Sequence, residues 1–168
     1  VEDFDKDGDD DIVTTTRTSN IFLDWWENDG KANFTRHTVA NGDTYLNLMQ
    51  VTVADLNLDG AKDIIVANLS LDRIDWWENK GDNLSFERHL VVDNYPQAHG
   101  VYSADIDGDG FKDIFVTFDA GYSTTPRGAG LFNYTSGNEI WHYEIGPRAA
   151  ATWPYAITDV DNDGVKEM

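Results

Sequence analysis

A nine-residue pattern of the form Asp-x-Asp-x-Asp-Gly-x-x-Asp recurs four times in this chain of 168 residues. The copies are DFDKDGDDD (3–11), DLNLDGAKD (55–63), DIDGDGFKD (105–113) and DVDNDGVKE (159–167), and they begin roughly 50 residues apart. A repeat of this length is typical of solenoids and propellers, whose units must stack on neighbours to bury their apolar faces. The repeat therefore restricts the fold before any single motif is interpreted.

The segments between the loops have the pattern of short β-strands. An apolar segment precedes each loop, and a β-rich run such as DIIVANL follows it. Aromatic segments come next (IFLDWWEN, RIDWWEN and EIWHYEI), and NFTRHTVA and SFERHLVV close the first two repeats. Gly, Asn and Asp separate these runs, and no segment has helical periodicity. Four antiparallel strands in about 50 residues make one propeller blade, so we expect an all-β fold.

The repeat divides the chain into parts of one partial β-propeller. We expect a truncated blade at 1–46, a full blade at 47–96, a full blade with an insertion at 97–150 and the start of another blade at 151–168. The insertion, 119–138, is expected to join the second strand of the third blade to the third. Because the chain begins and stops inside a motif, we also expect it to be a piece of a longer protein.

Adjacent tryptophans mark the third strand of the first two blades, at Trp25–Trp26 and Trp76–Trp77. Neighbours on a strand face opposite sides, so each pair presents one ring to each face. The second aromatic residue of each segment, which the repeat aligns with Tyr143, suits packing between blades. Stacking on sugar rings is the alternative role for these side chains.

The loops have the composition of a calcium site. Side-chain oxygens at positions one, three, five and nine converge, position seven supplies a backbone carbonyl, and Gly at position six permits a positive φ. Hard oxygen ligands favour Ca²⁺ over zinc or copper. Asp-Gly turns that bind nothing are the alternative, but a turn needs only one or two such residues.

We therefore expect about four structural Ca²⁺ ions, one in each loop. Asn57 brings no charge, which predicts a weaker second site, and Glu167 is one methylene longer than Asp. The predicted metal ligands are Asp3, Asp5, Asp7, Asp9, Asp11, Asp55, Asn57, Asp59, Ala61, Asp63, Asp105, Asp107, Asp109, Phe111, Asp113, Asp159, Asp161, Asp163, Val165 and Glu167.

These loops, the DIV, IIV and IFV runs after them, and WWEN with a later F-x-R-H resemble the FG-GAP and VCBS repeat β-propellers. That group includes the head of the integrin α-subunit, and the resemblance covers essentially the whole chain. It implies a seven-bladed propeller, of which this chain supplies about three blades. It also implies calcium in the loop between the first two strands of a blade, where a β-hairpin turn needs no following helix.

Composition excludes some partners and favours a secreted protein. The net charge of −19, from 31 acidic and 12 basic residues, argues against nucleic acid, which needs a basic face. No run approaches the length of a membrane span. Cysteine is absent, so disulfides and thiolate sites are excluded. Four N-x-S/T sequons predict a secreted glycoprotein, with glycans on Asn33, Asn68, Asn83 and Asn133.

One further set of residues could bind a ligand. Met49, His99 and Trp153 each stand six residues before the first Asp of a loop, near the expected entrance to the innermost strand. They either line a ligand site at the mouth of the channel or simply fill that channel. No G-x-S-x-G, H-E-x-x-H or phosphate loop is present, so no catalytic residue is assigned.

The sequence as a whole predicts a secreted, calcium-binding propeller that serves adhesion or binding. A glycan or an extracellular protein is the expected partner, and self-assembly is possible. One alternative is the propeller domain of a carbohydrate-active enzyme, such as a polysaccharide lyase or a sugar dehydratase. Another is a structural subunit of an extracellular fibre.

Overall fold

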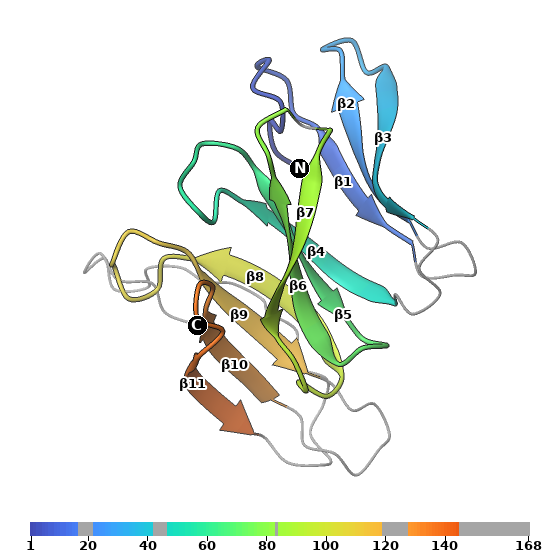
Figure 1. The fold of residues 1–168 in the computed structure, drawn as a ribbon. Coiled ribbons are helices and arrows are strands. Elements are labelled where there is room, and N and C mark those ends of the chain that lie inside the picture. Colours follow the sequence, from blue (N-terminus) through green and yellow to red (C-terminus); the bar gives the residue numbers. More distant parts are fainter. Residues whose placement is uncertain (17–21, 42–46, 83, 119–127, 145–168) are drawn as a thin grey trace.

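The computed structural model describes residues 1–16, 22–41, 47–82, 84–118 and 128–144 (Figure 1). Within these ranges the chain forms eleven strands and no helix. The strands are β1 (Ile12–Thr15), β2 (Phe22–Asn28), β3 (Phe34–Asn41), β4 (Leu48–Ala54), β5 (Asp63–Asn68), β6 (Arg73–Asn79), β7 (Phe86–Val92), β8 (Ala98–Ala104), β9 (Asp113–Phe118), β10 (Gly128–Asn133) and β11 (Glu139–Glu144). Since no helix is present in the described part of the chain, none there could cross a membrane.

The strands form three antiparallel sheets in chain order, as the repeat predicts. Blade one contains β1–β3, blade two β4–β7 and blade three β8–β11, and neighbours in sequence are neighbours in each sheet. The first strands of blades two and three, β4 and β8, lie next to each other. The expected all-β architecture of stacked blades is confirmed, and the described residues form a partial propeller that does not close into a ring (Figure 1).

The core lies between the blades, because the second strand of a blade has a neighbouring sheet on each side. Every residue of β5 is buried. Ile64 and Val66 pack towards blade one with Phe4 and Trp25, whose rings stack with centroids 5.1 Å apart. Ile65 belongs to the cluster shared with blade three. Side chains alternate between the two faces of a strand, so one β-branched run supplies both interfaces.

Blade three differs from the sequence-based assignment in its outer strands. Its third strand is β10, inside the segment that we interpreted as an insertion, and EIWHYE forms the fourth strand, β11. Tyr143 is therefore not equivalent to Trp77. Phe132 is, since it pairs with Ile114 of β9 as Trp77 pairs with Ile64 of β5.

The assignment failed because β10 (GAGLFN) has a composition typical of loops. Its glycines are required by close packing. A Cβ on residue 128 would overlap the backbone oxygen of Tyr143, and a Cβ on residue 130 would overlap the hydroxyl of Tyr95. Tyr143 itself lies on the outermost strand and is 57% exposed. The predicted role of this side chain between blades is not seen in the described part of the chain.

The two described members of the predicted ligand-binding set share an unusual backbone position. Met49 and His99 stand at register shifts near the starts of β4 and β8, where the pairing skips one residue. Both are half-buried. A β-bulge at the start of a strand redirects a side chain, so the repeat places both at the same end of their blades, away from the Asp-rich loops. Trp153 lies outside the described residues.

Candidate metal centre

The three described loops fold in the same way. The carboxylate at position one accepts a hydrogen bond from the backbone N–H of the Gly at position six, at 3.2, 2.9 and 3.1 Å in the first, second and third loops. The side chain at position three accepts from position five, and the one at position five accepts from position seven. Each acidic side chain thus folds the loop around itself, and all three loops lie at the same end of the sheets (Figure 1).

Two residues in each loop adopt a positive φ. The glycine at position six does so as the sequence predicts, with φ of 102°, 90° and 93° at Gly8, Gly60 and Gly110. Position four does so as well, at Lys6 and Leu58 with φ of 67° and 60°. Such angles are uncommon for residues other than Gly and Asn. The sequence indicates a positive φ at position four in the third loop, where that residue is a glycine, Gly108.

Position nine anchors each loop to the sheet. Asp11, Asp63 and Asp113 are buried, and the Oδ2 atom of each accepts a hydrogen bond from the backbone N–H of position two, at 2.9, 3.0 and 3.0 Å. In blades one and two the Oδ1 atom also accepts from the backbone N–H of Asn28 or Asn79, at the end of the third strand. In blades one and two, the side chain at position nine, which the sequence predicts as a metal ligand, therefore also connects the start of the loop to the third strand.

Oxygens at positions one, three and nine converge in the first and third loops, whereas the carboxylates at position five, Asp7 and Asp109, are not part of these groups. Atoms of Asp3, Asp5 and Asp11 lie within 4.8 Å of one another, and so do atoms of Asp105, Asp107 and Asp113. Two oxygens that share a Ca²⁺ ion at 2.3–2.6 Å lie at most about 5 Å apart. The first and third loops therefore bring together side chains at the spacing that one Ca²⁺ ion needs.

Two carboxylate oxygens at position one are left without a donor. Asp3 Oδ1 and Asp55 Oδ1 are buried and accept no hydrogen bond from the part of the chain that the structure describes. A buried polar atom without a partner destabilises a protein by roughly 1–3 kcal/mol. The equivalent atom of Asp105 accepts from the backbone N–H of Gly108, so the third loop satisfies its own first carboxylate.

Burial and mutual repulsion raise the pKa of several loop carboxyls. Burial, followed by the nearby charge of Asp59, raises the pKa of Asp63 to about 6 against hydrogen bonds that lower it. Burial also raises the pKa of Asp5 and of Asp113, with neighbouring carboxylates adding to the effect. Concentrated negative charge is thus unfavourable in these loops, and a bound cation would relieve it.

The second loop contains an amide at position three. Asn57 Nδ2 donates to Asp59 Oδ2 at 3.0 Å and to Glu78 Oε1 at 3.4 Å. Its oxygen still accepts from the loop backbone at 3.1 Å, as an Asp would. The residues at position seven are Asp9, Ala61 and Phe111. All five predicted ligands of the fourth loop, from Asp159 to Glu167, lie outside the described residues.

The outer strands of blades one and two support the loops through the D-W-W-E-N and R-H motifs, whose role the sequence interpretation missed. The first Asp pairs with the Arg, at 2.8 Å for both Asp24–Arg36 and Asp75–Arg88. The His side chain bonds to the Glu at 2.7 Å in both blades. The Asn amide reaches back to the carbonyl at position eight of the loop. Both motifs recur together in blades one and two, and this joint repetition could have indicated that they act together.

The first tryptophan of each pair is held by the same motif. Trp25 stacks on His37 with ring centroids 4.3 Å apart, and Trp76 packs on His89 at 4.7 Å. Trp26 and Trp77 lie near Arg36 and Arg88, 5.9 and 5.4 Å from the guanidinium carbon to the ring centroid. These rings pack within and between blades, which leaves stacking on sugars without support at either pair.

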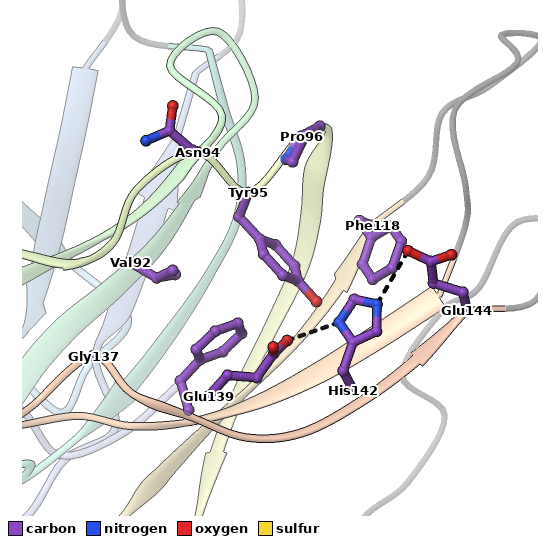
Figure 2. A pocket seen from close by; sticks show the side chains of 10 residues that line it. Val92, Asn94, Tyr95, Pro96, Phe118, Gly137, Glu139, His142 and Glu144 are labelled. Carbon is purple, nitrogen blue, oxygen red and sulfur yellow. Dashed lines mark hydrogen bonds and ion pairs between the residues drawn. The ribbon is translucent and has the colours of Figure 1, made fainter.

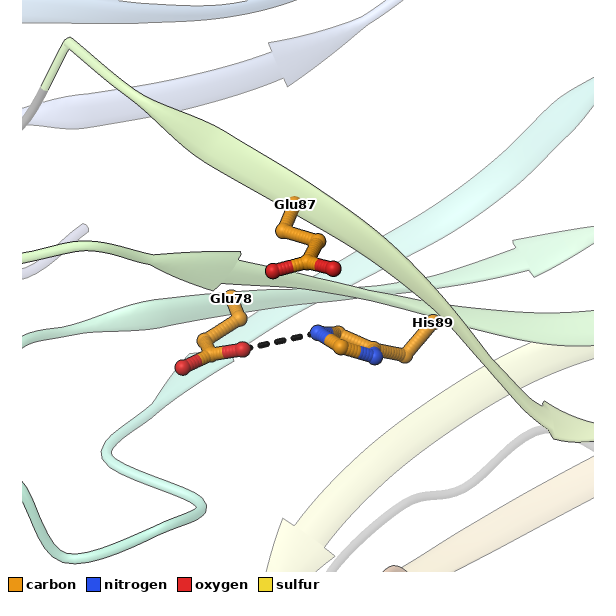
Figure 3. Close-up of side chains that lie close together, drawn as sticks. All are labelled: Glu78, Glu87 and His89. Atoms are coloured by element: carbon orange, nitrogen blue, oxygen red, sulfur yellow. Dashed lines mark hydrogen bonds and ion pairs between the residues drawn. The ribbon is translucent and has the colours of Figure 1, made fainter.

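A second cluster of possible ligands lies on the outer strands of blade two. Glu78, Glu87 and His89 bring their ligand atoms together, as Figure 3 shows. The Lys80 ammonium lies 2.7 Å from Glu78 and 2.6 Å from Glu87. This pairing lowers the pKa of both carboxyls. The cluster already contains its cation, so it is a surface ion-pair network and not a metal site.

The predicted glycan acceptors differ in their environment. Asn68 is fully buried and its amide lies 3.3 Å from Asp75, so the folded chain offers no exposed amide for a glycan at this position. Asn33 is exposed, with its amide on Asp29 at 2.8 Å. Asn133 is half-buried at the end of β10. Asn83 lies outside the described residues.

Comparison with known families supports the repeat. A family model described as an FG-GAP-like repeat matches residues 3–66 and again residues 55–116. Each match begins at the start of a loop and ends in the strand after the next loop, so each spans one repeat together with the loop that opens the next one. A search of curated proteins found no match to this chain.

Proposed function

The chain belongs to the FG-GAP-like repeat family, and from this premise we propose that it is a calcium-stabilised propeller segment of a secreted binding or adhesion module. Ca²⁺ sits in each Asp-rich loop, held by oxygens at positions one, three, five and nine and by the carbonyl at position seven. The partner is a glycan or an extracellular protein. It contacts the end of the blades opposite the loops.

One observation carries the calcium proposal: the buried, unpartnered Oδ1 atoms of Asp3 and Asp55. A loop that only turns the chain could satisfy these oxygens, as the backbone N–H of Gly108 satisfies the equivalent oxygen of Asp105. A Ca²⁺ ion bound to these oxygens would also neutralise the carboxylates around it. Its expected effect is structural, because each loop connects the first two strands of a blade.

Calorimetric titration of the chain with Ca²⁺ tests this proposal. We expect saturable binding with dissociation constants of about 10⁻⁴–10⁻³ M, the range of extracellular calcium modules. Ca²⁺ should raise the melting temperature by mass action, and a chelator should reverse the increase. The absence of both heat and melting shift at millimolar Ca²⁺ would rule the proposal out.

A pair of variants in the first loop separates ligation from general charge. Asp3→Asn replaces the carboxylate at position one and should weaken binding at that site at least about tenfold, because Ca²⁺ affinity depends on ligand charge. Asp10→Asn makes the same change in the same loop at an exposed position that supplies no predicted ligand. Equal losses in the two variants would mean that bulk charge, and not coordination, attracts the ion.

The position of the partner surface follows from the loops themselves. Residues in and beside a loop are needed to maintain the structure of that loop. The opposite end of the blades contains the bulged residues Met49 and His99 and the β7–β8 connection. Strand direction alternates in a blade, so the two ends are separate surfaces. Loss of partner binding with unchanged Ca²⁺ affinity in a Met49→Ala, His99→Ala double variant would support this assignment. A partner footprint on the Asp-rich loops would contradict it.

A further inference from the structure

A cavity of about 540 Å³ lies between blades two and three. Its walls come from the β7–β8 connection, the end of β9, and strands β10 and β11 (Figure 2). Binding sites for small molecules commonly have volumes of roughly 300–1,000 Å³. No residue of the three described Asp-rich loops lines this cavity, so it is distinct from the candidate calcium sites.

The floor of the cavity is aromatic and contains a hydroxyl without a partner. The Tyr95 ring meets Phe118 and Phe132 edge to face, with centroids 5.1 and 5.0 Å apart. Tyr95 is only 8% exposed, and its hydroxyl makes no hydrogen bond with the part of the chain that the structure describes. The missing Cβ of Gly130 provides the room for this hydroxyl. The fold thus keeps space for a buried polar group that it does not satisfy.

Two carboxylates line the same cavity and bond to opposite sides of one histidine ring. His142 Nδ1 lies 2.7 Å from Glu139 Oε1, and His142 Nε2 lies 3.3 Å from Glu144 Oε1 (Figure 2). The imidazole stacks on Phe118 with a centroid distance of 5.5 Å, which fixes its orientation. The Oε2 atoms of both carboxylates form no hydrogen bond with the described residues, and both side chains are accessible from solvent.

The charge at the cavity selects the type of ligand. Burial, then the negative charges of Glu139 and Glu144, raise the pKa of Tyr95, so the potential of both carboxylates reaches the buried hydroxyl. None of the described residues that line the cavity is a Lys or an Arg. The chain as a whole has a net charge of −19. A cation is attracted to these carboxylates, although their exposure to solvent weakens the attraction, whereas an anion would be repelled.

We propose that this cavity binds a primary ammonium group on an alkyl chain. The ammonium pairs with the free oxygen of Glu139 and donates a hydrogen bond to the Tyr95 hydroxyl, while Glu144, on the other side of the His142 ring, adds its negative charge. The alkyl chain lies on Phe118 and Phe132. This inference deepens the proposed function, since it gives the chemistry that a partner would present: either a lysine side chain of a protein or a free alkyl diamine.

Titration of the full chain in saturating Ca²⁺ with n-butylammonium tests the chemistry, with n-butanol and butyrate as neutral and anionic probes. We expect butylammonium to bind at least about tenfold more tightly than n-butanol, and butyrate not to bind, because the charge contributes most of the affinity. Binding of n-butanol or butyrate as tight as that of butylammonium overturns the proposal.

Three variants locate the binding site. Glu139→Gln with Glu144→Gln retains the shape of both side chains and should weaken butylammonium binding at least about tenfold. Tyr95→Phe removes only the hydroxyl and should weaken binding about threefold, while it leaves the aromatic packing intact. Glu27→Gln is the matched control, because Glu27 also bonds to a histidine at 2.7 Å but lies in blade one. Unchanged binding in the double variant, or an equal loss in the control, refutes the assignment.

The two sources of ammonium are separated with a lysine-containing peptide, its Nε-acetylated form and 1,5-diaminopentane. Tighter binding of the unmodified peptide, lost on acetylation, supports a protein partner, and tighter binding of the diamine supports a free amine. Binding of neither contradicts the proposal. The two proposals can be tested separately. If the chain binds butylammonium but not Ca²⁺, the calcium proposal is contradicted and the cavity assignment is not.

Discussion

Blades two and three contain the same Asp-rich loop but surround it with different outer strands. In blade two, the D-W-W-E-N and R-H motifs connect the loop to β6 and β7 through Asn79 and through the ion pairs of Asp75. In blade three, Gly130 stands where Asp75 stands, since it pairs with Val116 of β9 as Asp75 pairs with Val66 of β5. The loss of that carboxylate and its arginines leaves the space that the aromatic cavity occupies. The outer strands of blade two therefore support its loop, whereas those of blade three line the cavity that we propose as a binding site.

The largest expected difference concerns the carboxylate at position nine. Asp63→Asn should lower the free energy of unfolding by about 3 kcal/mol in saturating Ca²⁺, because the amide nitrogen would face one of the two N–H donors, Leu56 or Asn79. Asp113→Asn should cost about half as much, since the backbone N–H groups of Ile106 and Asp107 that bond to it belong to its own loop, which can adjust to the amide. Urea unfolding measures both values. Equal losses would mean that the outer strands do not support the loop in blade two.

The next effect concerns the ion pairs that blade three lacks. Asp75 is buried and accepts from Arg73 at 3.0 Å and Arg88 at 2.8 Å, so Asp75→Asn should destabilise the chain by about 2 kcal/mol. Asp24→Asn in blade one is the matched variant. It should cost less, because among the described residues Asp24 pairs with one arginine, Arg36, and Asp75 with two. A larger loss for Asp24 than for Asp75, again by urea unfolding, would contradict this explanation.

The third effect is the pH dependence of the second loop. The pKa of Asp63 is raised to about 6 by burial, above its ordinary value near 3.8. In a chelator, this group therefore contributes stability that is fully present below about pH 4 and is lost as the pH rises through 6. Ca²⁺ binding needs the ionised form, so affinity at this site should fall about tenfold for each pH unit below 6. Titrations at pH 5 and pH 7 measure the change, and Asp63→Asn should abolish it.

The smallest effect is the contribution of the Tyr95 hydroxyl to the free energy of unfolding. Tyr95→Phe should leave the free energy of unfolding unchanged or raise it by up to about 1 kcal/mol, because the buried hydroxyl it removes has no partner. Tyr95→Leu removes the ring contacts with Phe118 and Phe132 and should cost about 2 kcal/mol. A loss above 1 kcal/mol in the phenylalanine variant would show that the hydroxyl is bonded in solution.

Much of the fold could be predicted because the repeat is visible residue by residue. The loop spacing gave the blades, and the glycines at position six gave the turns between the first two strands. The convergence of positions one, three and nine was also predictable, since the loop is short and its hydrogen bonds are local. The roles of Asn79 and Asp75 were not, because each contacts residues on other strands of the sheet.

Sequence by itself determined the features that depend on local geometry: the Asp-rich loops, their positive φ and the four-strand repeat with its alternating apolar faces. Only the tertiary structure decided which segment became the third strand of blade three and where space remained. β10 has little intrinsic strand preference, and it is a strand because β9 and β11 supply hydrogen-bond partners on both sides. The cavity likewise exists because residues 95, 118 and 142, from three separate segments, meet between two blades. Packing between segments that are distant in sequence depends on the exact shapes that meet, and no local pattern records those shapes.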